Sequence, residues 1–410
     1  MSTQAPQSKS LESIGAGIKF NLKPDLVCFS HLRWDFVHQR PQHLLSRAAK
    51  DRRVFFIEEP VFDTGAMRLE VAERENGLQL VVPHLPDGLR SQVAANVVLR
   101  DLVQRLFLKN GVINFVAWYY TPMALSFTSE FAPLAVIYDC MDELSAFKGA
   151  DERLSIFERE LFGMADLVFT GGQSLYEAKR AQHDSVHCFP SSIDRDHFMQ
   201  ARSEMDEPED QKEIPHPRLG FFGVIDERFD NELLKAIAQA RPDWHFVMLG
   251  PVVKIDPASL YQADNVHYLG GKSYQDLPRY ISGWAVALMP FAQNEATRFI
   301  SPTKTPEYLS AGRRVVSTPI NDVVHPYGDL GLVEIAGNPV DFIASISRSL
   351  EKQPDSDNWM DRTDAFLSDM SWDLTWSRMS QLIDEAVDKK HRGGEESVEV
   401  LARQAGVGGS

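Results

Sequence analysis

Short apolar runs alternate with amphipathic stretches along the first half of the chain. The run DLVCFSHL (25–32) predicts a buried strand, and QRPQHLLSRAAK after it has the spacing of a helix. Further strand-like runs follow, namely RRVFFIEEP, INFVAWYY, LAVIYDC, ADLVFTGG and SVHCFPS. The Asn76–Gly77 pair inside RLEVAERENGLQLVVPHLP predicts a hairpin. Continuous apolar strands that alternate with helices predict a parallel sheet covered on both faces.

The pattern breaks at SEMDEPEDQKEIPHP (203–217), which is acidic, holds three prolines and has no apolar periodicity. The alternation restarts at RLGFFGV (218–224). We therefore expect two doubly wound, Rossmann-like α/β domains that face a central cleft, with ligands at the carboxyl ends of the strands. The predicted segments are a flexible N-terminus (1–22), a first Rossmann-like domain (23–202), a linker (203–217), a second Rossmann-like domain (218–370), a C-terminal helix that could pack back on the first domain (371–390) and a disordered tail (391–410).

Composition and charge narrow the function classes. The 410 residues carry a net formal charge of −16, which argues against nucleic acid as a partner. The N-terminus lacks the apolar core of a signal peptide, and no uncharged apolar run is long enough to span a membrane. Three cysteines without a CxxC pair are typical of a reducing compartment. We expect a cytoplasmic protein and leave open a peripheral contact with the inner face of the membrane.

The stretch SPTKTPEYLSAGRRVVSTPI (301–320) has an unusual charge pattern. Pro306 favours the first turn of a helix, and Gly312 is suited to end it. Glu307 suits the positive end of the helix dipole, whereas Lys304 does not, at a cost of a few tenths of a kcal/mol. A bound anion would resolve the conflict, which predicts a phosphate site. The alternative is a solvated lysine beside a glutamate that the helix dipole favours. This stretch alone supports the two interpretations equally.

This stretch resembles the donor-site segment of GT-B glycosyltransferases, particularly the retaining family four (glycosyl transferases group 1). Other segments resemble the same family: CFPSSIDRDHF, LGFFGVIDERFDNELL and NVHYLGGKSYQDLPRYISGWAVALMPF. In the first half, HLRWDFVHQRPQHLLSRAA and YDCMDELSAF look like a bacterial subgroup linked to polysaccharide synthesis. The resemblance implies the GT-B fold and a nucleoside diphosphate-sugar donor.

The resemblance also implies site residues. Glu307 would bind the ribose of the donor, and Ser301, Thr303 and Lys304 would lie near its phosphates. The implied donor-binding set is Gly223, Arg228, Leu269, Arg298, Ser301, Thr303, Lys304 and Glu307. The implied catalytic set is Asp142, Arg228, Lys304 and Glu307. Enzymes of this fold generally stabilise the leaving diphosphate without a metal ion, so no cofactor is expected.

The chain departs from the family pattern at several positions. Phe299 occupies the place of an acid, Val224 and Phe229 those of an arginine and a lysine, and Met141 that of a histidine. Arg228 or Arg298 would then supply the missing positive charge.

The loop HLRWDFVHQRPQH after the first strand is dense in donors and aromatic residues. Arg33, Trp34 and Arg40 are predicted to hold phosphate or sugar in the cleft, with Trp34 stacking on a sugar face. In the structural alternative, Trp34 anchors the core and Arg40 pairs with Glu58 or Glu59.

These observations predict a metal-independent hexosyltransferase that moves a sugar from a nucleoside diphosphate-sugar to a hydroxyl of a glycan or lipid-linked acceptor. By resemblance, the anomeric configuration would be retained. Two alternatives stay open, a nucleotide-sugar epimerase of similar fold and a nucleotide-sugar-binding protein without catalysis. The carboxylates Asp139, Asp142 and Glu143 have no histidine at metal-ligand spacing, and a metal site is not expected there.

Overall fold

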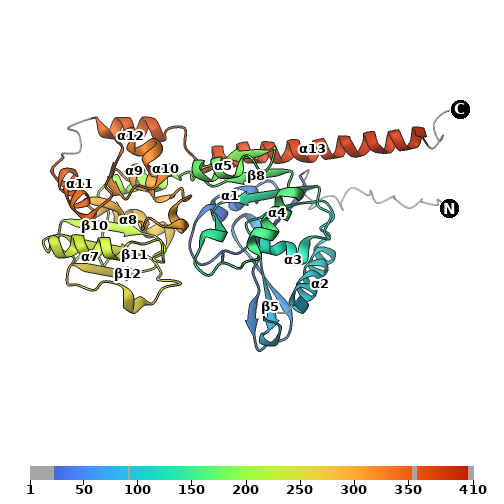
Figure 1. The fold of residues 1–410 in the computed structure, drawn as a ribbon, viewed down its shortest axis with the longest axis horizontal. Helices are drawn as coiled ribbons and strands as arrows, with labels where there is room; N and C mark the ends of the chain where they lie inside the picture. Colours follow the sequence, from blue (N-terminus) through green and yellow to red (C-terminus); the bar gives the residue numbers. More distant parts are fainter. Residues whose placement is uncertain (1–22, 91–92, 353–357, 405–410) are drawn as a thin grey trace, which may run out of the picture.

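Two α/β domains lie side by side in the computed structural model (Figure 1), which describes residues 23–90, 93–352 and 358–404. The predicted flexible N-terminus, 1–22, and the last six residues of the predicted tail lie outside the described residues. Each domain is built on one sheet, with helices on both sides of it. This arrangement confirms the predicted pair of doubly wound units.

The first domain contains a nine-stranded sheet in the order β3-β5-β2-β1-β6-β7-β8-β9, with β4 paired to β5. The strands are β1 (Asp25–Ser30), β2 (Val54–Glu58), β3 (Val61–Asp63), β4 (Arg68–Glu73), β5 (Gln79–Pro86), β6 (Phe115–Tyr119), β7 (Ala135–Cys140), β8 (Leu167–Thr170) and β9 (Val186–Cys188). All pairings are parallel except β4 with β5, which form the predicted hairpin through Asn76 and Gly77, both at positive φ. The central strands are buried throughout because helices cover both faces.

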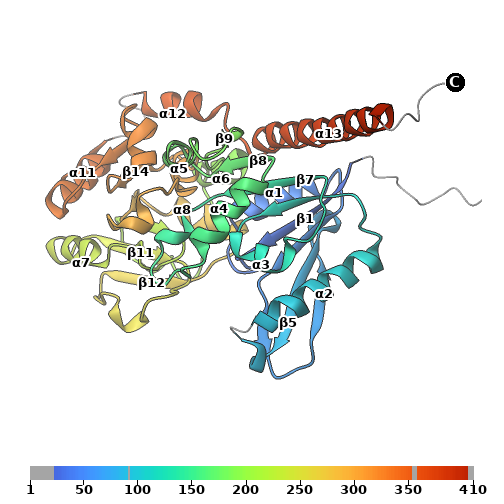
Figure 2. The same ribbon diagram turned by 45° about the vertical axis from the view of Figure 1, so that its right-hand side comes forward.

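Alternate side chains of β1 enter two separate cores. Val27 and Phe29 pack in one cluster, and Leu26 and Cys28 pack in the other. The first face is covered by α2 (Val93–Asn110), α3 (Leu125–Thr128), α4 (Leu154–Met164) and α5 (Gln173–Lys179). Figure 2 shows α2 and α3 side by side on this domain. The opposite face is covered by α1 (Arg40–Ala48) and α13 (Trp372–Gln404).

The second domain has a six-stranded, fully parallel sheet in the order β12-β11-β10-β13-β14-β15. Its strands are β10 (Arg218–Phe222), β11 (His245–Leu249), β12 (Val266–Gly270), β13 (Val286–Met289), β14 (Arg314–Ser317) and β15 (Val333–Ile335). The order reverses between β10 and β13, as in a doubly wound sheet with a ligand crevice at that point.

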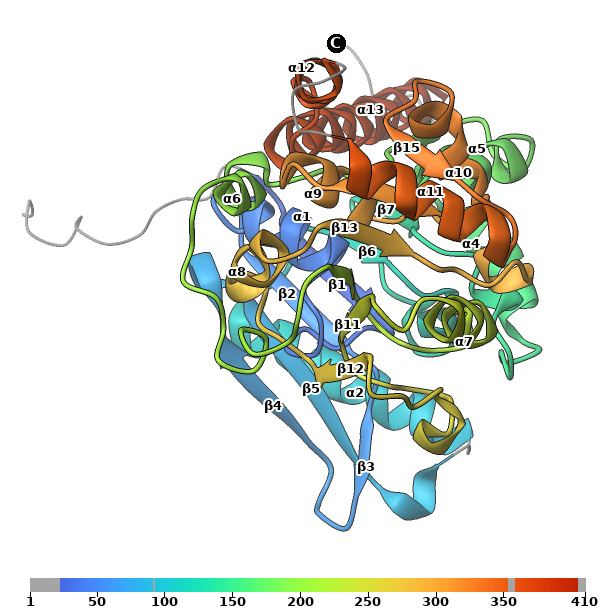
Figure 3. The same cartoon turned by 90° about the vertical axis from the view of Figure 1, so that its left-hand side faces the viewer.

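Helices cover both faces of the second sheet (Figure 3). One face carries α7 (Asn231–Ala240) and α11 (Pro339–Glu351), which contact each other. The other carries α8 (Leu277–Ser282) and α9 (Lys304–Ser310), with α6 (Arg195–Met199) and α12 (Trp359–Leu367) outside them. The short α10 (Asn321–Val323) follows β14. Gly312, at φ +72°, ends the helix α9 as predicted.

The chain between the domains packs against the second domain. Gln211 is buried, accepts a hydrogen bond from Trp284 Nε1 at 2.9 Å and donates one to the carbonyl of Tyr280 at 2.9 Å. The segment predicted as a linker (203–217) is therefore fixed by side-chain contacts that its composition did not indicate.

The helix α13 returns to the first domain after the second is complete and runs along it in Figure 1. Trp372, Trp376, Met379 and Ile383 are buried in a first-domain core cluster. The helix ends at Gln404, so the expectation of disorder from residue 391 is wrong for the described part of the tail. The sequence EESVEVLARQ is rich in helix formers, which outweigh the preceding glycine pair.

Among the described residues, no helix is both long enough and apolar enough to cross a bilayer.

Candidate active site

A cavity of about 650 Å³ lies between the two domains, at the carboxyl ends of their strands. It is lined by the first-domain loop that follows β1 and by the ends of β10 and β11 with the approach to α9. Nine predicted site residues line it: Trp34, Arg40, Asp142, Gly223, Arg228, Ser301, Thr303, Lys304 and Glu307. The structure therefore brings together most of the candidates that the sequence scatters over 270 positions.

Two glycines form a backbone floor under the second-domain half of the cavity. Gly223 and Gly250 follow adjacent strands, and both adopt φ +139°. A Cβ on Gly250 would lie 1.8 Å from the carbonyl oxygen of Gly223, and a Cβ on Gly223 would lie 2.2 Å from Lys304 Cε. Only glycine fits either position. The sequence analysis predicted Gly223 and missed Gly250. Gly250 could have been found because it directly follows a predicted strand, as Gly223 does.

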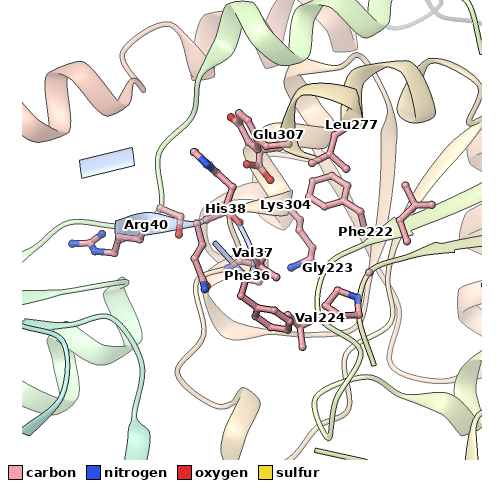
Figure 4. Close-up of a pocket in the computed structure, with 18 of the residues that line it drawn as sticks. Phe36, Val37, His38, Arg40, Phe222, Gly223, Val224, Leu277, Lys304 and Glu307 are labelled. Atoms are coloured by element: carbon pink, nitrogen blue, oxygen red, sulfur yellow. The ribbon is translucent and has the colours of Figure 1, made fainter. Parts of the chain in front are cut away.

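Lys304 extends from the start of α9 across this floor, and its ammonium points into the cavity (Figure 4). Within the described chain the ammonium has no hydrogen-bond or ion-pair partner; it lies 5.7 Å from the ring centre of Phe221 and 5.8 Å from that of Phe291. Burial and the nearby Arg228 guanidinium lower the pKa of Lys304. An anionic ligand would offset both effects.

Arg228 brings a second cation to the same cavity. Its guanidinium hydrogen-bonds Asp226, with the shortest contact at 2.7 Å, and lies 5.4 Å from the ring centre of Phe147 in the first domain. Although burial opposes its charge, the carboxylates of Asp226 and Asp142 raise the pKa of Arg228. Arg228, rather than Arg298, thus lies where it can supply the positive charge absent from position 224.

Glu307 is a buried carboxylate that faces the cavity without a partner. Its side chain is 4% exposed, and no described residue hydrogen-bonds its Oε2. Burial raises the pKa of Glu307, and Lys304 opposes that shift only in part. An unpaired buried carboxylate is costly for folding, so the arrangement is typical of a site that binds a hydrogen-bond donor from a ligand.

Asp142 lines the cavity from the first domain, whereas the neighbouring carboxylates of Asp139 and Glu143 form ion pairs within that domain. Asp139 binds Arg40, and Glu143 lies 2.7 Å from Lys179. Burial raises the pKa of Asp142, and Arg228 partly offsets it. Across the described ranges, no three His, Cys, Asp or Glu side chains are grouped to hold a metal ion.

Arg40 has a different partner from either one considered in the sequence analysis. It is 3% exposed, and its guanidinium binds both carboxylate oxygens of Asp139, at 3.0 Å, and the carbonyl of Phe189 at 2.8 Å. In Figure 4 the guanidinium points away from Lys304. The alternative pairing with Glu58 or Glu59 is wrong, because Asp139 holds Arg40, while Arg33 binds the Glu58 carboxylate at 2.8 Å and the backbone carbonyl of Glu59 at 2.6 Å.

The aromatic side chain that the cavity exposes is Phe36 rather than Trp34. Trp34 is 9% exposed and packs edge-on against Phe56, with ring centres 5.0 Å apart. Phe36 is 52% exposed and projects into the cavity (Figure 4). Trp34 is therefore part of the core, as in the structural alternative. The exposed flat ring in this loop is that of Phe36.

His38 and Tyr274 also line the cavity and were missed by sequence reasoning. Their rings stack 4.3 Å apart across the domain boundary, and His197 stacks on Tyr274 at 4.4 Å. The isolated tyrosine carried no sequence signal, because its partners lie more than 70 positions away.

Two predicted donor-site residues lie outside the cavity. Arg298 is exposed, 3.6 Å from Glu295, with its guanidinium over the ring of Phe299. Phe299, at the position of the missing acid, packs on a first-domain core cluster. Leu269 is half-buried in β12 against the second-domain core. These positions do not support direct donor contacts by Arg298 or Leu269.

Direct contacts hold the two domains together beside the cavity. Ser191 Oγ donates to the carbonyl of Ser301 at 2.8 Å, and Ser174 hydrogen-bonds Asp322 through its backbone amide at 3.0 Å and through its hydroxyl. These contacts fix the distance between the two halves of the site.

Comparisons with known proteins agree with this geometry. Residues 216–352 match the family model Glycosyl transferases group 1. The matched residues run from just before β10 to the end of α11. The chain is 27% identical over 259 residues to the "Putative teichuronic acid biosynthesis glycosyltransferase TuaH" of Bacillus subtilis (strain 168). That match covers 58% of this chain and 64% of the relative.

Solved structures show that both domains together have the GT-B fold. Sucrose-phosphate synthase from Thermosynechococcus elongatus superimposes with a TM-score of 0.66 at 14% identity, over 88% of this chain and 99% of that one. The "Trehalose-6-phosphate" structure from E. coli, bound with UDP-2-fluoro glucose, gives 0.62 at 12% identity, over 87% and 98%. The predicted GT-B fold is confirmed, and the second domain is similar to glycosyl transferases group 1.

Proposed function

We propose that this GT-B chain transfers a hexose from a nucleoside diphosphate-sugar, held by the second domain, to an acceptor hydroxyl presented by the first domain, with retention of the anomeric configuration. The observation that carries the proposal is the pair of partnerless charged groups in the cavity. Lys304 offers an ammonium without a hydrogen-bond or ion-pair partner in the described chain, and Glu307 a carboxyl group whose Oε2 has no hydrogen-bond partner there.

A nucleoside diphosphate-sugar fits both groups at once. Its phosphates would accept hydrogen bonds from Lys304 and Arg228 above the glycine floor, where Gly223 permits close backbone approach. A ribose hydroxyl would donate to Glu307, which would satisfy the buried carboxylate. The proposed donor thereby removes the electrostatic cost that the free protein bears.

The same groups would promote the reaction. When the bond between the anomeric carbon and the diphosphate oxygen breaks, negative charge grows on the diphosphate, and two fixed cations stabilise that charge. The acceptor oxygen forms the new bond to the anomeric carbon, and its proton leaves with the diphosphate. Closure of the two domains around the donor would exclude water, which would otherwise hydrolyse it. The mechanism requires no metal ion.

The acceptor side is proposed from the first domain. Phe36 offers an exposed ring to a sugar, and Asp142 is placed to orient a hydroxyl. The similarity to a protein named for teichuronic acid biosynthesis favours a polysaccharide or its lipid-linked precursor as the acceptor.

The test begins with donor binding. Thermal unfolding is followed with UDP-, GDP-, ADP- and dTDP-sugars, because a ligand at ~100 times its Kd adds about 2.7 kcal/mol of stability. One of the four should raise Tm in the wild type and not in Glu307→Ala. Failure of every donor to shift Tm would contradict the proposal.

Turnover is then measured with the donor that binds. Release of the nucleoside diphosphate should depend on an added acceptor and persist in EDTA. Release together with an altered free sugar, and no acceptor product, would instead identify an epimerase. Binding without any turnover across acceptor classes would identify a non-catalytic binding protein.

A further inference from the structure

The first domain contains a second cavity, of about 290 Å³, which we call the side cavity. It lies at the ends of β1 and β2, beneath the start of α2 and beside α3, two helices that Figure 2 shows next to each other. Its wall is mainly apolar, and the largest of these side chains are Phe29, Ile57, Phe62, Leu99, Met123 and Phe127.

Among the polar side chains in this wall, Glu59 and Arg153 are exposed to solvent and Asn96 accepts a hydrogen bond from Ser126, while four more have partners in the protein. Glu58 accepts from the Trp34 amide at 2.7 Å and from Arg33 at 2.8 Å. The others are Ser30, Thr121 and Ser126, whose oxygens bond Leu32 N at 3.0 Å, Met123 N at 3.3 Å and Asn96 Oδ1 at 3.3 Å. A sugar needs free donors and acceptors, and this wall offers few. The cavity suits a hydrocarbon.

Exposed aliphatic side chains continue the apolar surface outside the side cavity. Val93, in its wall, is 80% exposed, and Val97, one turn further along α2, is 62% exposed. On α4, Ile156 is 54% exposed, one turn beyond the cavity residue Arg153. The apolar surface thus leads outward, as expected for a chain that continues into a membrane or micelle.

A thin wall separates the side cavity from the donor cavity. Trp34 lines the donor cavity and Glu58 lines the side cavity, and the two are joined by the 2.7 Å hydrogen bond. Both cavities therefore open along the same edge of the first sheet. A single acceptor can reach the donor with its polar end while its apolar end occupies the side cavity.

We propose that the side cavity binds the alkyl or isoprenoid chain of a lipid-linked acceptor. The inference rests on the proposed transferase function and selects, between a free glycan and a lipid-linked precursor, the lipid-linked one. The position of the side cavity beside the donor cavity selects the occupant, because an unrelated lipid or a second copy of the chain would have no reason to lie beside the transferred sugar.

The experiment measures binding of dodecyl phosphate by the full chain, with three variants. Val93→Asp places a charge at the mouth of the side cavity, and Ala124→Leu fills part of its interior, where Ala124 is 5% exposed. Val340→Asp is the matched control, because this valine is 75% exposed on α11 in the second domain. Tm confirms folding of each variant.

We expect the wild type and the control to bind dodecyl phosphate equally, and Val93→Asp and Ala124→Leu to bind it at least fivefold more weakly. With a lipid-linked acceptor, the two variants should raise the acceptor KM at unchanged kcat. The Tm shift caused by the sugar nucleotide should stay as in the wild type, since the donor cavity is intact. If Ala124→Leu fails to fold, Val93→Asp still tests the proposal.

The outcomes separate this inference from the proposed function. Equal binding of dodecyl phosphate by wild type and Val93→Asp would overturn the lipid-chain site. Binding of acceptor-free phosphatidylglycerol vesicles that Val93→Asp abolishes, with transfer to a soluble glycan unaffected, would assign the side cavity to bulk lipid and also overturn it. Loss of the donor Tm shift in the wild type would instead refute the proposed function.

Discussion

Replacing Lys304 by methionine tests the electrostatic core of the proposed site. Methionine keeps the length and apolar stem of lysine but removes the charge. An ammonium about 4 Å from one phosphate charge gains about 4 kcal/mol at an effective dielectric constant of about 20. Desolvation and repulsion by Arg228 offset part of that gain, and hydrogen bonds to charged groups contribute about 1.5–3 kcal/mol net. Lys304→Met should therefore weaken nucleoside diphosphate binding roughly 10- to 150-fold.

Isothermal titration calorimetry with UDP, GDP and ADP at pH 7 measures this loss. The control is Lys352→Met, which removes a lysine that pairs with Glu334 on the far side of the second domain. The free energy of unfolding should not fall in Lys304→Met, because burial and Arg228 together outweigh the nearby carboxylates and disfavour the charge in the folded protein, which lowers the pKa of Lys304. Binding within twofold of the wild type would refute the assignment of Lys304 to the diphosphate.

The pH dependence of binding gives an independent check. Burial, with the nearby Arg228, lowers the pKa of Lys304 to about 8 in the free protein, and a bound diphosphate would raise it again. Above pH 8 the ligand must therefore bind together with a proton. In a Glu307→Gln background, which removes a carboxylate that raises the pKa of Lys304, the fall should begin below pH 8 and reach up to about tenfold per pH unit. Affinity that stays constant from pH 7 to 9 would contradict the argument.

Three further substitutions have defined outcomes. Arg40→Ala leaves Asp139 buried without its partner and should lower the free energy of unfolding by about 3–5 kcal/mol in urea titrations, whereas loss of an exposed surface arginine should cost under 1 kcal/mol. Gly223→Ala forces a Cβ into a φ of +139° and should cost about 1–3 kcal/mol and at least tenfold in nucleotide affinity, while Gly88→Ala, with open space around it, should change neither. Burial raises the pKa of Glu307 to about 8, so its contribution to stability is complete below the unfolded pKa near 4.5 and is lost as pH rises to 8. The Tm of ligand-free Glu307→Gln, relative to wild type, should accordingly rise by at least about 2 °C between pH 5 and pH 8, measured by calorimetry.

The elements and their order were predictable from local pattern. Buried parallel strands such as DLVCFS and RLGFF are continuously apolar, and the Asn76–Gly77 pair required the hairpin that the structure shows. The donor-site candidates could also be predicted from the sequence. Lys304 and Glu307 lie within one turn of a short helix, and their charge pattern is unfavourable without a ligand.

Partners across the fold were not predictable, because they depend on tertiary packing. Arg40 pairs with Asp139, 99 positions away, and the loop after β1 turns Trp34 into the core and Phe36 toward the cavity. Sequence alone shows that the loop holds two aromatic residues and not which one faces the ligand. The contact between His38 and Tyr274 likewise exists only when both domains are in place.

The route of the chain limits how the domains can move. The polypeptide passes from the first domain to the second after β9, since Ile193 already packs in the second-domain core, and it returns before Trp372, where α13 anchors on the first core. Two covalent crossings act as a double hinge, which permits rocking about the line that joins them and resists twisting. Neither half is then an independent unit. Proteolysis between the two crossings would separate α13, which covers one face of the first sheet, from all the strands of that sheet.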